Sequence, residues 1–185
     1  WECRKELFTA GSTNRRKMLR NKIIPLICAL LCVTACGIYS FSGTSIQGDV
    51  KSITINYFDY KALKVNPTLS NDLTEALRNQ FRKMTNLEQV DMDGDLEIIG
   101  EITGYDVRAT AITAGDVASQ NRLTVNVKVS FTNRKHPEDD FTGKSFSAYS
   151  DFDSTNSLDA VESTLVAEII EKLVDDIFNA TVAQW

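Results

Sequence analysis

The stretch RLTVNVKVSFT, residues 122–132, alternates apolar and polar side chains without interruption. The apolar set is Leu123, Val125, Val127, Val129 and Phe131, and the polar set is Arg122, Thr124, Asn126, Lys128, Ser130 and Thr132. Because successive side chains of a β-strand point to opposite faces, the pattern predicts a strand with one buried and one exposed face. Such strands are typical of antiparallel sheets with water on one side.

Neighbouring segments supply partners for this strand. GDLEIIGEITGYDVRA (residues 94–109) precedes it, and FTGKSFSAYSDF (residues 141–152) follows it after a polar turn, so both predict paired strands. Nearer the amino terminus, SITINYF (residues 52–58) predicts another strand, and residues 87–90 a short one. The alternating side chains of SITINYF fall into two sets: Ile53, Ile55 and Tyr57 on one face, and Thr54, Asn56 and Phe58 on the other.

Two segments carry apolar side chains at the three- and four-residue spacing of amphipathic helices. The first runs from about residue 69 to residue 84, and Thr68, which follows Pro67, is expected to cap its amino terminus. The second begins near Ser157. With the strands, these helices predict one α+β domain over residues 51–185, in which two helices pack on one face of a four- to five-stranded, mostly antiparallel sheet.

The amino-terminal part of the chain has a different character. An apolar run at residues 23–34 follows Arg20 and Lys22 and is too short for a membrane-spanning helix, which takes about 20 residues. It predicts a secretory signal peptide, with residues 1–35 removed. The tetrapeptide VTAC, residues 33–36, resembles a bacterial lipobox, which implies that Cys36 is the lipid attachment site and residues 36–50 a lipidated tether. Alternatively, Cys36 merely ends an apolar segment.

The charge balance argues against one class of function. Residues 1–35 hold seven Lys and Arg and two Asp and Glu, so 13 basic and 23 acidic residues remain, a net charge of −10. Because neutralisation of phosphates by Lys and Arg supplies most of the affinity for nucleic acids, we expect no nucleic-acid partner.

No cluster of residues predicts catalysis. The only histidine, His136, stands in KHPEDD beside three carboxylates, but consecutive ligands in one turn are not the usual spacing of a metal site. The acidic turn at residues 91–95 lacks the remaining ligands of a calcium-binding loop. With one histidine and no nucleophile elbow, a Ser-His-Asp triad is not expected. The sequence therefore predicts no enzyme, no metal and no cofactor.

The order of four segments, CGIYSFSGTSI (residues 36–46), SITINYF (52–58), NPTLSNDLTEALRNQF (66–81) and DGDLEIIGEITGYDV (93–107), resembles the LptE-type lipopolysaccharide-assembly lipoproteins, particularly their Bacteroidetes-like branch. The resemblance implies two helices on a four-stranded sheet. It also implies a lipid-anchored protein of the outer membrane that plugs a large LptD-like β-barrel translocon, assists its assembly and helps to insert lipopolysaccharide into the outer leaflet. Gly37 stands after Cys36 in place of the aspartate that retains lipoproteins at the inner membrane in enterobacteria, which agrees with the outer membrane. The acidic cluster that surface-exported lipoproteins of Bacteroidetes tend to carry after this cysteine is missing from the sequence, which favours a periplasm-facing position.

The resemblance also implies contact with lipopolysaccharide through basic side chains. Phosphates and sugar acids need cations on the exposed sheet face. Arg122 and Lys128 share that face of one strand, and Arg108 lies near Arg122 if the two segments form a hairpin. These three residues are the candidate lipopolysaccharide contacts, although they could equally be ordinary solvated or paired charges.

Two other functions fit the same composition. One is a pilot or assembly lipoprotein of a different outer-membrane complex, which would share the anchor and the small α+β body. The other is a lipid-anchored periplasmic binding module with a cavity between helices and sheet. The predicted core positions hold Leu, Ile, Val and Phe throughout, which favours a filled core over a cavity.

Overall fold

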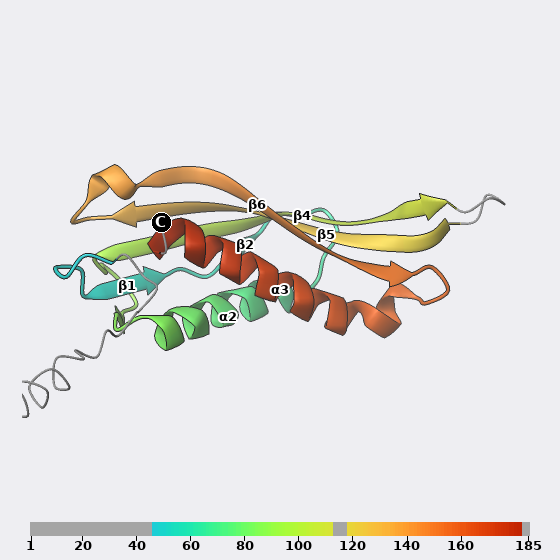
Figure 1. The fold of residues 1–185 in the computed structure, drawn as a ribbon, viewed down its shortest axis with the longest axis horizontal. Helices are drawn as coiled ribbons and strands as arrows, with labels where there is room; N and C mark the ends of the chain where they lie inside the picture. Colours follow the sequence, from blue (N-terminus) through green and yellow to red (C-terminus); the bar gives the residue numbers. More distant parts are fainter. Residues whose placement is uncertain (1–45, 113–117, 183–185) are drawn as a thin grey trace, which may run out of the picture. The chain divides into compact units, whose positions relative to one another are not determined.

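The computed structural model describes residues 46–112 and 118–182. In chain order the elements are β1 (Ser52–Ile55), β2 (Asp59–Tyr60), α2 (Leu69–Met84), β3 (Glu88–Gln89), β4 (Leu96–Ile112), β5 (Ala118–Asn133), the 3-10 turn η1 (Pro137–Asp139), β6 (Phe141–Asp153) and α3 (Leu158–Val182) (Figure 1). The predicted α+β fold with two helices is therefore confirmed, and both helices begin within a residue of their expected positions.

The strands form one mixed sheet in the order β3–β1–β4–β5–β6, and β2 pairs with β4 beyond the end of β1. Long antiparallel ladders join β4 to β5 and β5 to β6, whereas β1 runs parallel to β3 and β4. The parallel pairs arise because α2 follows β1 in the chain and precedes β3 and β4. It carries the chain back to the end of the sheet where β1 began, so that β3 and β4 run in the same direction as β1. The sheet thus has six strands and a parallel part that the pattern did not reveal, but its antiparallel ladders are the longer ones.

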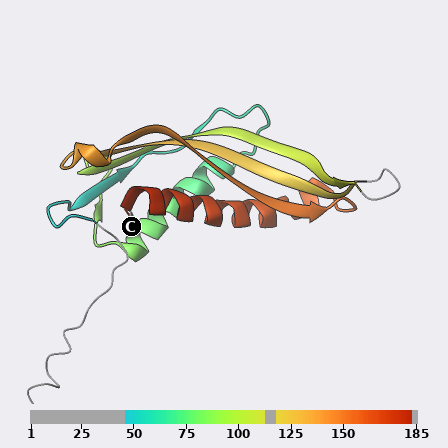
Figure 2. The same cartoon turned by 45° about the horizontal axis from the view of Figure 1, so that its top comes forward.

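Both helices cover the same face of the sheet (Figure 2). Beneath them, the apolar residues of β5 from Leu123 to Phe131 are at most 2% exposed. Ile169, Leu173 and Ile177 of α3 are fully buried. The apolar half of the alternating pattern therefore forms the core. Neither of the two described helices is long and apolar enough to cross a membrane.

The strand predicted at residues 52–58 is shorter than expected, because its alternation breaks after Ile55. Tyr57 is 56% exposed and Phe58 is fully buried, which reverses their predicted burial relative to the isoleucines. The Phe58 ring packs against Gly100 of β4, where an added Cβ would lie 2.2 Å from Cε1 of the ring. The Phe58 backbone N–H donates to Thr74 Oγ1 of α2 (3.2 Å). Contact with a glycine and a helix, rather than strand periodicity, therefore decides the direction of this ring.

The amino terminus of α2 is capped by a different residue from the one predicted. The Thr68 side chain makes no capping hydrogen bond to the helix. Instead, Asn66 Oδ1 accepts hydrogen bonds from the backbone N–H groups of Thr68 (3.1 Å) and Leu69 (3.0 Å). Asn66 also donates to Glu162 of α3 through Nδ2 (3.1 Å). One asparagine therefore satisfies the end of α2 and connects it to the other helix.

Candidate ligand-binding surface on the open face of the sheet

We call the side of β4, β5 and β6 that points away from α2 and α3 the open face; no described helix covers it (Figure 2). On β5 it consists of the polar half of the alternating pattern, from Arg122 to Thr132. Tyr149 of β6 and Ile99 of β4 lie on it and are 47% and 53% exposed. A ligand can reach these side chains without any rearrangement of the core.

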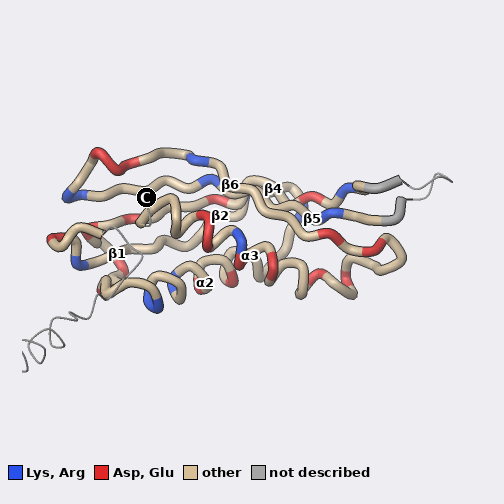
Figure 3. Tube along the Cα trace, in the orientation of Figure 1, with Lys and Arg blue, Asp and Glu red and all other residues tan. Residues whose placement is uncertain are grey.

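Two candidate cations meet at one place on this face. The register of the β4–β5 ladder makes Arg108 and Arg122 direct cross-strand neighbours. Side chains at such positions have Cβ atoms about 5 Å apart, so their positive charges repel each other unless an anion lies close by. The positions of basic and acidic residues along these strands are visible in Figure 3.

The anion beside Arg122 is Asp151, its direct neighbour on β6. The guanidinium donates to both carboxylate oxygens, from Nε at 2.6 Å and from an Nη at 2.8 Å. This pairing holds the pKa of Asp151 below its usual value and raises the pKa of Arg122. The same guanidinium lies 3.7 Å from the ring centroid of Tyr149, a cation–π contact. Arg122 is therefore fixed in orientation and partly neutralised.

Arg108 is exposed and has no ion pair among the described residues. It is therefore the cation of this pair that remains available to an anionic ligand. Asp106 and Thr124 form the next cross-strand pair along β4 and β5 on the open face, so an acid lies close to the two arginines. The surface there has mixed charge.

Lys128 lies further along β5, where its cross-strand neighbours are Glu101 on β4 and Ser145 on β6. Glu101 already pairs with Lys61, whose hydrogen bond lowers the pKa of that carboxyl, and Lys128 lowers it further. Lys128 itself has no ion pair among the residues that the structure describes, and it is exposed. A second available cation therefore lies six residues from Arg122, about 20 Å at the rise of a strand.

Hydroxyl and amide groups, together with the carboxylate of Asp106 and the ring of Tyr149, occupy the space between the two cationic positions. Thr124 and Asn126 come from β5, and Ser145 and Ser147 from β6. Asn126 lies over Gly104 of β4, where an added Cβ would be 2.7 Å from its Nδ2. These groups both donate and accept hydrogen bonds, as sugar hydroxyls do. The open face thus offers two separated cations joined by a polar strip.

The structure brings Arg108 and Arg122 together, as the hairpin hypothesis required, and leaves Lys128 apart from them. Cys36 lies outside the described residues. Sequence reasoning missed the partners of the cations: Asp151 and Tyr149 beside Arg122, and the Lys61–Glu101 pair beside Lys128. A register for the β5–β6 ladder would have revealed the first two, but the alternating pattern gives no register.

The acidic turns flanking the sheet form ion pairs. His136 Nε2 lies 3.1 Å from Asp49 and its Nδ1 lies 3.3 Å from Glu138. Arg134 bridges Asp93 and Glu97, and Lys135 lies 3.5 Å from Asp95. No group of three or more His, Cys, Asp and Glu side chains in the described part of the chain is placed to hold a metal ion. These turns are therefore held together by charge pairing.

A filled core beneath two helices and a polar open sheet face define a small α+β domain. The chain belongs to the LptE family of lipopolysaccharide-assembly proteins, whose family model matches residues 50–181. This match covers the described sheet and both helices and confirms the predicted family. Members of the family are non-enzymatic assembly lipoproteins.

Solved structures with a similar arrangement include the hypothetical protein CT253 from Chlamydia trachomatis, with 7% identity, a TM-score of 0.50, and coverage of 71% of this chain and 98% of that one. Lipoprotein B from Nitrosomonas europaea has 12% identity, a TM-score of 0.47, and coverage of 71% and 85%. At these identities the first likeness concerns the fold alone. No curated protein matches the chain by sequence.

Proposed function

We propose that this protein is a lipid-anchored lipopolysaccharide-assembly protein of the outer membrane, held through Cys36 in the periplasm-facing leaflet. In this proposal it lies as a plug inside a large LptD-like β-barrel, assists assembly of that barrel and helps lipopolysaccharide to reach the outer leaflet. Family membership supports the general role. The partner, the anchor and the direct contact with lipopolysaccharide are the parts that require experiment.

One observation carries the direct contact. The open face presents Arg108 and Lys128, two exposed cations without an ion pair among the described residues, on either side of a strip in which hydroxyl and amide groups outnumber the one acid, Asp106. Lipid A phosphates and sugar acids are anions, and charge-assisted hydrogen bonds to Lys and Arg are the strong interactions available to them. Arg122, oriented by Asp151, would add to the contact at Arg108.

A carrier with a ligand cavity between helices and sheet is less well supported. Core side chains between the two layers, such as Phe58, Leu77 and Val127, are completely buried. A groove of about 830 Å³ lies between the helices, and none of its lining residues comes from the sheet. The described core is thus packed rather than hollow.

The partner is tested by affinity purification. The full chain, tagged at its carboxyl end, is expressed in its host with Cys36 intact or changed by Cys36→Ser, and solubilised outer membranes are analysed by mass spectrometry. We expect a lipopolysaccharide-translocating barrel to co-purify in near-stoichiometric amount. The Cys36→Ser variant should also fail to incorporate labelled palmitate. Recovery of a secretion or pilus pore would assign the protein to the pilot class, and recovery of no barrel would contradict the plug proposal.

A further inference from the structure

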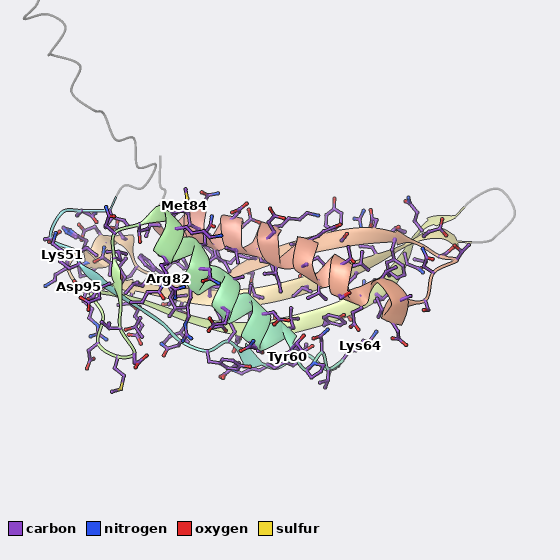
Figure 4. The ribbon with its side chains drawn as sticks, turned by 90° about the horizontal axis from the view of Figure 1, so that it is seen from below. Lys51, Tyr60, Lys64, Arg82, Met84 and Asp95 are labelled. Atoms are coloured by element: carbon purple, nitrogen blue, oxygen red, sulfur yellow. The ribbon has the colours of Figure 1, made fainter. Side chains whose placement is uncertain are left out.

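The groove between α2 and α3 lies on the side of the domain opposite to the open face. Figure 4 views this side, with the two helices next to each other. At one end of the groove Glu162 accepts hydrogen bonds from Tyr105 and Asn66. Toward the other end Gln80 of α2 donates to Asp175 of α3 (3.2 Å), and the rings of Phe81 and Phe178 meet edge to face with centroids 5.0 Å apart. These contacts fix both ends of the groove.

The floor of the groove is apolar. Val166, Ile170 and Val174 of α3 line it, each between 5% and 7% exposed, together with the half-buried Ala76 of α2. These side chains belong to the edge of the core and leave a shallow apolar strip between the helices. An apolar group laid in this strip would be removed from water at a gain proportional to the area it buries.

The rim of the groove is acidic. The only basic residue in its lining is Lys83. Five carboxylates line it: Asp72, Asp159, Glu162, Glu171 and Asp175. None of the five pairs with a lysine or arginine among the described residues. Hydrogen bonds to Glu162 and Asp175 come from neutral donors. The groove therefore carries negative charge that the domain itself leaves uncompensated.

This chemistry identifies the occupant. Phosphate-bearing lipid is repelled by the rim, and a small cation would make no use of the apolar floor. A peptide segment with a row of apolar side chains flanked by Lys and Arg satisfies both the floor and the rim, as amphipathic helices do in apolar grooves. We propose that the α2–α3 groove is a docking site for a basic amphipathic segment of a protein partner, separate from the proposed lipopolysaccharide contacts of the open face.

The test uses the full chain in detergent and two fluorescently labelled model peptides. One is a short amphipathic helix of leucine and lysine, and the other has the same leucine pattern with glutamate in place of lysine. Anisotropy should show binding of the lysine peptide only. The double variant Glu171→Lys with Asp175→Lys should raise its Kd by about tenfold or more, because attraction at the rim becomes repulsion. Ala76→Trp, which fills the floor without a change of charge, should also weaken binding.

A matched double variant, Glu88→Lys with Asp91→Lys, makes the same change of charge at exposed acids outside the groove lining. It should alter the Kd by less than about twofold. Circular dichroism checks that each variant remains folded. Equal weakening by both double variants would show nonspecific attraction to an acidic protein and overturn the proposal. Binding of the glutamate peptide, or no binding of either peptide, would do the same.

Discussion

Arg108 and Arg122 face each other across β4 and β5, yet within residues 46–112 and 118–182 only Arg122 has an acidic partner, Asp151. The two like charges thus have different states: one is paired and stacked on Tyr149, and the other is exposed and unpaired among the described residues. If the open face binds lipopolysaccharide, Arg108 should therefore contribute more to the affinity than Arg122.

The first prediction concerns Arg108. Arg108→Glu should weaken binding of purified lipopolysaccharide to the full chain by about tenfold, because a charge-assisted contact is replaced by repulsion. Titration followed by light scattering or calorimetry measures the change. Lys51→Glu makes the same change of charge at an exposed lysine outside the open face and should have little effect. Equal losses in both variants would show that net charge, and not this site, governs binding.

The second prediction has the opposite sign. Asp151→Asn removes the carboxylate that neutralises Arg122 while keeping its size and part of its hydrogen bonding. The released guanidinium should strengthen lipopolysaccharide binding by about two- to fivefold, although the thermal midpoint of the protein should change little because the pair is solvent-exposed. Weaker binding by Asp151→Asn would mean that orientation of Arg122 matters more than its free charge.

The third prediction tests the contact between Gly100 and Phe58. Gly100→Ala should lower the free energy of unfolding by about 1–3 kcal/mol, because the added Cβ and the buried ring cannot occupy the same space. Urea denaturation measures this change. Gly48→Ala adds the same group where nothing lies within 4 Å and should be tolerated. In the Phe58→Leu background the cost of Gly100→Ala should shrink, since the ring that causes the clash is absent.

The fourth prediction separates the true helix cap from the predicted one. Asn66→Ala removes the acceptor for two backbone N–H groups and the donor to Glu162, so it should cost about 1–2 kcal/mol of stability. Thr68→Ala should cost less than about 0.5 kcal/mol. Denaturant midpoints for the two variants give the comparison, and the reverse order would restore Thr68 as the cap.

The fifth prediction is a dependence on pH. Hydrogen bonds to Asp49 and Glu138 raise the pKa of His136, and the His136 contact lowers the pKa of Asp49. The stabilisation by charged His136 is complete below its unfolded pKa of about 6.5 and is lost as pH rises through the higher folded value. His136→Gln should therefore lower the thermal midpoint near pH 5.5 but hardly at all near pH 9. A loss of the same size at both pH values would contradict this origin.

The sequence predicted the helices and strands whose apolar side chains all lie on one face, because their spacing is regular. The alternation from Arg122 to Thr132 identified the core and the open face of β5, and three- and four-residue spacing identified α2 and α3. Where a residue depends on a distant partner, the local pattern was insufficient: Phe58 turns inward because Gly100 provides room, and Asn66 replaces Thr68 as the cap. β1 runs parallel to its neighbours because α2 returns the chain to the same end of the sheet, and hydrophobic periodicity does not reveal the direction of a strand.

The sequence likewise predicted which residues of the candidate site share a face, but not which partners they have. Alternation places Arg122 and Lys128 on a wet face, a hairpin places Arg108 near Arg122, and the ladder confirms that the two arginines are neighbours. The difference between the paired Arg122 and the unpaired Arg108 was not predictable, since it depends on the β5–β6 register that brings Asp151 to Arg122. The acidic groove depends on the relative rotation of two helices that are far apart in the sequence.

The strict two-residue spacing along β5 constrains how this segment can evolve. Substitutions among its outward residues leave the apolar core untouched, so the fold itself tolerates a change of surface chemistry. Loss or gain of a single residue between Leu123 and Val127 would instead turn Val127 toward water and Lys128 toward the helices. Relatives should therefore differ mainly in the outward residues of this strand and very little in its length.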